Sequence, residues 1–272
     1  MGKLGRSWEL MKTSLGVLRK DKEIMIFPIL SFVACVILLI SFFAGFFFLG
    51  LPTMESSIWL WVVLMILIYF VLFFIVIFFN TAIIGCANIR LNGGDPTVAD
   101  GFRIASQNIG RILLWAIISA TIGMILQAIR ERAGWIGKIV AGIIGLAWTY
   151  VTFFVIPVII FEKKGVGSSI RRSASLFKQT WGETIIGTFG FGIIFGLLAL
   201  LGIIPIILGL ILGSTMAIII GFIIAFFYWA IIGVVASATN GIYVAALYQY
   251  ATKKQLPPEF DASLIPPAVQ GV

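Results

Sequence analysis

Residues 172–182 read RSASLFKQTWG, and residues 6–16 read RSWELMKTSLG. Both segments are basic and amphipathic, and each precedes a long apolar run. This pattern is typical of a helix that lies in the membrane interface before the chain enters the bilayer. The two copies therefore predict a repeated architecture for the chain between them.

The composition points to a membrane protein. Of the 272 residues, 61% are hydrophobic and 11% are charged, so a water-soluble fold would expose large apolar surfaces. Runs that reach the ~20 residues needed to cross a bilayer cover residues 24–51, 58–91, 109–129, 135–161 and 184–250. The last run is long enough for two spans, and its turn signals are Gly209, Gly213, Ser214 and Thr215. We predict an all-α integral membrane protein with six transmembrane helices.

The distribution of cations predicts the orientation of these helices. With alternating spans, 16 of the 19 Lys and Arg residues fall on one side, and Arg130, Arg132 and Lys138 fall on the other. Since positive charge is enriched on the cytoplasmic side, we expect a multi-pass plasma membrane protein with both termini in the cytoplasm. The segment before Ile24 is too long and too amphipathic for the start of a cleavable signal peptide, so the first helix is expected to remain.

A third amphipathic segment emerges when Gly16, Gly110 and Gly182 are aligned. In each segment, spacings of four and three place the apolar residues on one helical face: Leu4, Trp8, Met11, Leu15 and Leu18; Val98, Phe102, Ala105, Ile109 and Ile112; and Ile170, Ala174, Phe177 and Trp181. Each interfacial helix would introduce one outward and one inward span, giving three tandem hairpins with a common orientation.

These repeat units cover approximately residues 1–92, 93–164 and 165–256, and together they form a single polytopic membrane domain over residues 1–256. Pro257 and Pro258 stop a further helix at the place where a fourth unit would begin. We therefore predict an irregular cytoplasmic tail over residues 257–272.

Three polar residues occupy equivalent positions in the repeat. Asn80, Thr152 and Asn240 each lie about ten residues before the cytoplasmic end of a span, hence roughly 15 Å deep at 1.5 Å per residue. One interpretation is that they line a shared polar path around a pseudo-threefold axis. The alternative is that they form hydrogen bonds between helices and only stabilise the packing.

The residues that usually carry enzyme chemistry are scarce. The chain has no histidine, which removes the commonest general base and transition-metal ligand. Asp95 and Asp100 lie near Arg103, but the further aspartates that a metal site in a lipid-headgroup transferase needs are absent. The spans hold no Asp, Glu, Lys or Arg between their ends, which argues against carboxylate-coupled ion transport. We expect no enzymatic activity, no cofactor and no metal site.

The net charge of +8 is spread along helix ends and belongs to no recognised nucleic-acid module. Cations beside a membrane attract anionic lipid headgroups. We therefore expect anionic lipids of the cytoplasmic leaflet as partners, and no nucleic acid. The candidate headgroup contacts are Arg6, Lys12, Arg19, Arg171, Arg172 and Lys178.

Proline and glycine predict local irregularities within the spans. Pro157 should kink the fourth span, and Pro205 should kink or interrupt the fifth near its outer end. The series Gly187, Gly190, Gly192 and Gly196 lies inside a span, where we interpret it as a surface that lets helices approach closely.

Several segments resemble a prokaryotic family of multi-pass membrane proteins that is known only as a domain of unknown function. They are residues 5–8, 18–23 and 27–28 near the start, residues 93–97, 115–127 and 145–157 with Glu162, and residues 172–183 and 260–261. The resemblance covers nearly the whole chain and supports six spans, but it implies no activity.

Two functions remain open at this level. The first is a passive transport or channel-like protein, which can be a homo-oligomer, with a polar path near the middle of the membrane. The second is a non-transporting scaffold whose interfacial helices bind anionic lipid or a partner protein.

Overall fold

The computed structural model describes residues 3–48, 58–253, 257, 258 and 260 of the chain. Within these residues every regular element is a helix, in line with the all-α prediction. The elements are α1 (Lys3–Lys20), η1 (Lys22–Met25), α2 (Ile26–Phe48), α3 (Ile58–Leu91), α4 (Val98–Gln107), α5 (Ile109–Arg132), α6 (Trp135–Val151), α7 (Val155–Phe161), α8 (Val166–Gln179), α9 (Trp181–Leu201), α10 (Ile204–Ile211) and α11 (Thr215–Lys253).

Six segments are long and apolar enough to cross a membrane, which confirms the predicted number. The predicted turn in the last apolar run is also present, because α10 ends at Ile211 and α11 begins at Thr215. Gly213 adopts a left-handed conformation there, with φ of +66°, which a residue without a side chain tolerates best. The predicted outer loop over residues 52–57 and most of the predicted tail over residues 257–272 lie outside the described residues.

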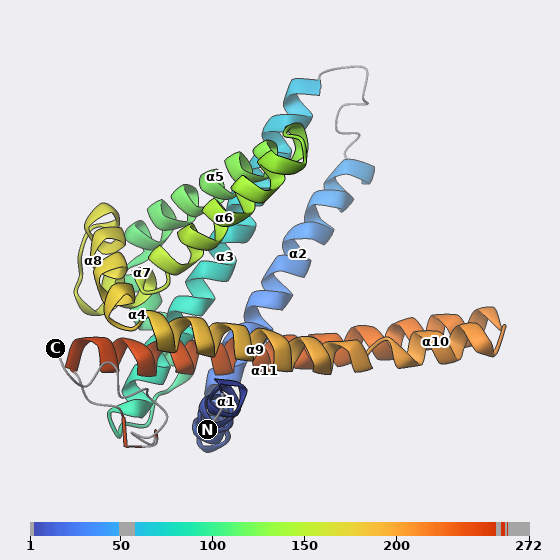
Figure 1. Cartoon of the computed structure of the whole chain (residues 1–272). Helices are drawn as coiled ribbons and strands as arrows, with labels where there is room; N and C mark the ends of the chain where they lie inside the picture. Colours follow the sequence, from blue (N-terminus) through green and yellow to red (C-terminus); the bar gives the residue numbers. More distant parts are fainter. Residues whose placement is uncertain (1–2, 49–57, 254–256, 259, 261–272) are drawn as a thin grey trace.

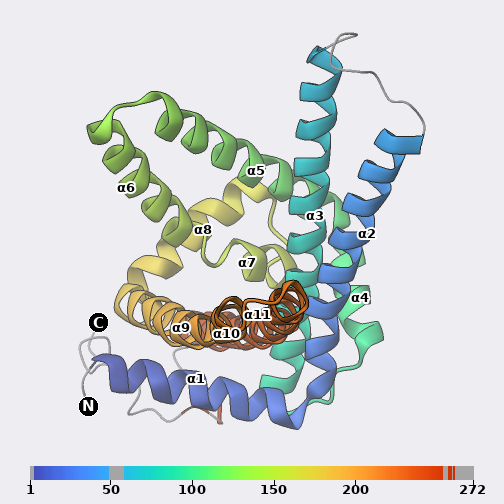
Figure 2. The same cartoon turned by 90° about the vertical axis from the view of Figure 1, so that its right-hand side faces the viewer.

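The buried core lies at one end of the spans, which we call the base. The base contains the last turns of α3 and α11 together with α7, and α1, η1, α4 and α8 surround them. Its largest fully buried side chains include Phe27, Ile83, Phe154, Ile242 and Tyr243. From the base, the pairs α2/α3, α5/α6 and α10/α11 extend in different directions and separate from one another (Figures 1 and 2).

Each of the three short amphipathic helices, α1, α4 and α8, packs against one of the helix pairs. α4 contacts α3, and α8 contacts α6 and α7, so each of these helices packs on the pair that precedes it in the chain. α1 packs instead on α9 and α11, which lie far from it in the sequence. The N-terminal helix thereby joins the first part of the chain to the last, as Figure 2 shows along the lower edge of the molecule.

The amphipathic helices bury part of their apolar face against protein. In α1 the fully buried residues are Leu10, Met11, Ser14, Val17 and Leu18, whereas Trp8 of the predicted face is 49% exposed. In α8 the buried residues are Val166, Ser169, Ser173 and Leu176, and the predicted Ile170, Ala174 and Phe177 are only half-buried beside them.

Both predicted proline irregularities are present. The fifth span breaks between Leu201 and Ile204, with Pro205 in the first turn of α10, where its missing N–H costs no hydrogen bond. The fourth span breaks over residues 152–154, between α6 and α7, two residues ahead of Pro157.

The break in the fourth span is filled by a serine from α8. The Ser173 hydroxyl donates to the Val151 carbonyl at 2.6 Å and accepts from the Phe154 N–H at 2.9 Å. Ser173 is fully buried, so these bonds satisfy two backbone groups that the break would otherwise leave unpaired in an apolar environment.

The glycine interpretation needs a correction. A Cβ added at Gly192 or Gly196 would meet nothing within 4 Å, so these two positions are not sites of close helix approach. Close approaches of one helix to the backbone of another occur in the last pair, where a Cβ at Gly209 or Gly221 would collide with backbone atoms of the facing helix. The sequence pattern failed because glycine spacing alone does not show which helical face meets a neighbour.

Candidate functional site

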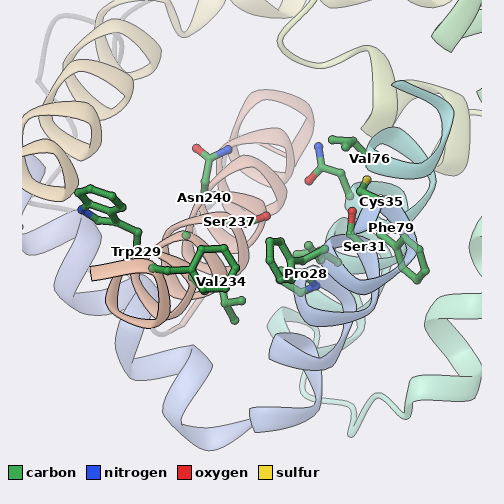
Figure 3. A pocket seen from close by; sticks show the side chains of 15 residues that line it. Pro28, Ser31, Cys35, Val76, Phe79, Trp229, Val234, Ser237 and Asn240 are labelled. Atoms are coloured by element: carbon green, nitrogen blue, oxygen red, sulfur yellow. The ribbon is translucent and has the colours of Figure 1, made fainter. Parts of the chain in front are cut away.

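A pocket of about 570 Å³ lies between α2, α3 and α11, where these helices leave the base. Figure 3 shows Ser31 and Cys35 on one wall, with Ser237 and Asn240 on the other. The complete lining consists of Pro28, Ser31, Phe32 and Cys35 from α2; Val76, Phe79, Asn80 and Ile83 from α3; and Phe226, Trp229, Ala230, Gly233, Val234, Ser237 and Asn240 from α11.

Two of the three sequence-predicted path residues meet at this pocket. Asn80 is half-buried and Asn240 is exposed, and both lie within segments that can span a membrane. The two helices that carry them are far apart in the sequence but pack directly against each other. Two of the residues that the predicted repeat makes equivalent therefore line the same pocket.

The third residue, Thr152, does not line the pocket. It lies at the break between α6 and α7, where its hydroxyl donates to the Trp148 carbonyl at 2.7 Å. This bond within its own helix satisfies the hydroxyl without any partner from another span. Of the three residues predicted to line a shared polar path, only Asn80 and Asn240 line this pocket.

Among the polar side chains of the pocket, the Trp229 indole N–H donates to the Ala199 carbonyl at 2.8 Å, whereas two amides and two hydroxyls form no hydrogen bond with protein in the described parts of the chain. These are the amides of Asn80 and Asn240 and the hydroxyls of Ser31 and Ser237. By contrast, Thr81 and Thr239 beside them donate to the Ile77 and Val235 carbonyls of their own helices. Each amide offers two donors and one acceptor, and leaving such a group unpaired in an apolar medium costs about 4–8 kcal/mol. The pocket therefore suits a molecule that can donate and accept hydrogen bonds.

Sequence reasoning missed the contribution of α2. Ser31 and Cys35 are four residues apart, so they share a helical face. Their spacing in an otherwise apolar span was the available signal, but it could not show that this face meets α3 and α11.

Close packing seals the pocket toward the base. A Cβ at Gly241 would collide with Ile83, so α11 and α3 touch immediately below Asn80 and Asn240. Ile83 and Ile242 are fully buried at this contact. This contact closes the pocket toward the base.

A second polar cluster lies in the base, around Glu162. Its carboxylate accepts from the Arg172 guanidinium at 3.0 Å and from the Tyr248 hydroxyl at 3.2 Å, and it pairs with Lys164. Burial by itself raises the pKa of Glu162, but the hydrogen bonds and charges of Lys164 and Arg172 outweigh it and hold this pKa below its usual value. Arg172, predicted as a headgroup contact, therefore has a carboxylate partner.

Most of the remaining candidate headgroup contacts are more exposed than Arg172. Lys12, Arg19, Arg171 and Lys178 are exposed on α1 and α8. The side chain of Arg6 lies outside the part of the structure that is described. Exposed cations on α1 and α8, which both contact α9 and α11, are compatible with the predicted contact to anionic lipid.

The acidic residues near Arg103 have local partners. Asp100 and Thr97 form a reciprocal capping box at the start of α4, and Arg103 pairs with Asp100. The hydrogen bonds from Thr97 lower the pKa of Asp100. Asp95 lies 3.4 Å from the Arg90 guanidinium, so the two carboxylates serve the loop and the helix start.

Together these features define, over the described residues, an all-helical protein with six helices able to span a membrane and a pocket whose polar lining groups are uncharged. The chain belongs to a family of unknown function, DUF6159, whose sequence pattern matches residues 57–256. No curated protein and no solved structure matches the chain.

Proposed function

We propose that the protein provides a passive route through the membrane for a neutral, hydrogen-bonding molecule, and that the pocket between α2, α3 and α11 is its binding site. The observation that carries this proposal is the convergence of Asn80 and Asn240, with no protein partner for either amide among the described residues, on one pocket. A polar side chain that only stabilises helix packing would form its hydrogen bonds with a neighbouring helix.

The chemistry of the lining supports a neutral ligand and uncoupled movement. The 15 lining residues include no Asp, Glu, Lys or Arg, so nothing in the pocket offers a counter-ion to a charged ligand. Transport coupled to protons generally depends on ionisable groups at membrane depth. Passage would require α11 to separate from α3 at Gly241 and Ile83, which now close the pocket toward the base.

The proposed arrangement in the membrane follows the charge pattern. The three helix pairs act as tandem hairpins in the plasma membrane, with α1, α4 and α8 at the cytoplasmic surface and both termini in the cytoplasm. The clustering of Arg90, Arg103 and Arg172 on elements of the base supports this orientation.

Glycerol passage into proteoliposomes tests the proposed function. Stopped-flow light scattering should show faster glycerol entry with protein than without it. Asn80→Leu and Asn240→Leu should each remove most of the protein-dependent rate. Thr149→Val is the matched control, since Thr149 is an exposed span residue whose hydroxyl donates to the Gly145 carbonyl away from the pocket. If Asn80→Leu and Asn240→Leu lower the thermal stability but leave glycerol entry unaltered, the proposal is wrong and the two amides have a packing role.

A second candidate, a scaffold that binds anionic lipid, is favoured by the exposed cations Lys12, Arg19, Arg171 and Lys178. Replacing these four by Gln should then weaken binding of the detergent-solubilised protein to vesicles containing phosphatidylglycerol while leaving glycerol entry intact. Equal binding by the fourfold variant would exclude this candidate.

A further inference from the structure

We infer that the ligand of the pocket is an uncharged single-chain amphiphile that enters from the bilayer, with its polar head between Asn80 and Asn240 and its chain extending away from the base. This inference rests on the proposed function for the polar site, and it adds the chemical class of the ligand and the direction of entry.

Along α11 the lining changes from polar to apolar with distance from the base. On α11, Asn240 and Ser237 lie nearest the base, whereas Phe226 lies almost four turns further out. On α3, Asn80 lies nearer the base than Val76. A ligand that satisfies both ends needs a hydrogen-bonding head that points toward the base and an apolar part that points outward.

The apolar end of the pocket faces the space where the helix pairs separate. Phe32 of α2 and Phe226 of α11 are in contact, with ring centroids 6.0 Å apart, and both rings are about half exposed. Beyond them α2/α3 and α10/α11 extend in different directions (Figures 1 and 2). Lipid can therefore reach the pocket from the side, past these two rings, while Gly241 and Ile83 close it below.

The volume of the pocket and the lack of charge in its lining further restrict the class of molecule that it can bind. A volume of about 570 Å³ exceeds the roughly 30 Å³ that one water occupies in the liquid and falls among ligand pockets of about 300–1,000 Å³. The lining has no carboxylate and no cation, so a phosphate or carboxylate head would be desolvated without a counter-ion. Hydroxyl or amide heads can pair with the two asparagines and two serines instead.

Gly233 offers a direct way to block the pocket. It lines the pocket on α11, and a Cβ added there would meet nothing within 4 Å. A leucine at this position can fill the pocket without displacing the backbone. Gly196 of α9 is the matched control, because it is also an exposed helical glycine with open space around it and lies outside the lining.

The experiment uses a monoacylglycerol with a photoreactive diazirine in its chain, added to the full chain in proteoliposomes. Irradiation should label residues of α2 and α11 around Phe32 and Phe226. Unlabelled monoacylglycerol should compete, whereas the fatty acid of the same chain length, ionised at pH 8, should not. Gly233→Leu should reduce specific labelling about tenfold, whereas Gly196→Leu should leave it unchanged.

Ser237→Val is a second blocking variant that replaces the hydroxyl by two methyl groups, and it should also reduce labelling if Gly233→Leu fails to fold. Labelling that is unaffected by a folded variant, or that the fatty acid competes equally well, would overturn the inference. Glycerol passage without specific labelling would leave the proposed route standing and overturn the amphiphile. Labelling that depends on the pocket without glycerol passage would support the amphiphile and refute the route.

Discussion

Ser173 shows how a single side chain can stabilise an interrupted span. A helix break in an apolar environment leaves backbone groups without partners, and each such group costs several kcal/mol. Ser173 pairs the Val151 carbonyl and the Phe154 N–H from the neighbouring helix α8. The break near Pro157 is therefore tied to α8, and α8 cannot leave without exposing it.

Replacing Ser173 by Ala should destabilise the protein by about 1–3 kcal/mol, because two buried backbone groups lose their partner. Thermal unfolding in detergent micelles should show a lower midpoint for Ser173→Ala. Ser175→Ala is the matched control, since Ser175 lies exposed on the same helix. Equal midpoints for the two variants would contradict the role assigned to Ser173.

Gly241 and Gly233 lie about two turns apart on α11, and their replacement by alanine should affect stability differently. A methyl group at Gly241 collides with Ile83, whereas a methyl group at Gly233 enters open space. Gly241→Ala should therefore lower the unfolding midpoint by an overpacking cost of about 1–3 kcal/mol. Gly233→Ala should leave the midpoint unchanged or raise it, because alanine favours the helix. A higher midpoint for Gly241→Ala would show that α3 and α11 are not packed as described.

At the scale of elements, the charged cluster around Glu162 joins three helices. Glu162 follows α7, Arg172 belongs to α8, and Tyr248 belongs to α11, so one carboxylate links the end of α7 to both other helices. The carboxylate is 19% exposed, which limits screening by solvent. The ends of these helices are thereby held in register at the base.

This cluster should make stability depend on pH. Because the pKa of Glu162 is lower in the folded protein than its ordinary value of 4.5, the pairing contributes fully above pH 4.5 and is lost as the pH falls through the folded pKa. Glu162→Gln should lower the unfolding midpoint at pH 7. The gap between wild type and variant should stay constant from pH 7 to 5.5 and narrow below pH 4.5. A gap that widens on acidification would refute the assignment.

The N-terminal helix α1 packs against helices that are far from it in the sequence. It packs on α9 and α11 at the opposite end of the sequence, with Met11 buried in the contact. Met11→Ala should destabilise the protein by about 2–5 kcal/mol, as for other buried large-to-small changes. Trp8→Ala, at a position that is 49% exposed, should cost much less. Protease cleavage within α1 should increase only in Met11→Ala; equal cleavage of the two variants would argue against this docking.

At the scale of the whole molecule, a packed base carries spans that separate from one another. The windows that define the spans are at most 33% buried inside the chain, so most of their surface faces lipid or another protein. The long helix α3 illustrates the division of roles. Its last turns lie in the core of the base, and its first turns extend outward beside α2 (Figure 1).

The proposed topology predicts which residues each aqueous phase can reach. With Cys35 and Cys86 replaced by Ala, single cysteines at Arg132 and Lys138 should react with an impermeant maleimide added outside intact cells. Cysteines at Arg103 and Lys163 should react only after the cells are permeabilised. Reaction of the second pair in intact cells would reverse the orientation, and reaction of all four would contradict the number of spans between them.

The sequence alone determined the number of spans, the turn between α10 and α11, and the breaks near Pro157 and Pro205. These features depend on hydropathy and backbone chemistry within a few residues, so they can be read locally. It also identified Asn80 and Asn240, because a polar residue in an apolar span stands out against its neighbours.

Only the tertiary structure decided which of these residues meet. Asn80 and Asn240 share a pocket with Ser31 because α3, α11 and α2 pack together, although they are distant in sequence. Thr152 occupies the equivalent repeat position, but the helix break at that point pairs its hydroxyl with its own helix. Internal repetition preserves spacing along the chain, whereas membership of a site depends on which helical faces pack against each other, and that is a property of contacts between distant segments.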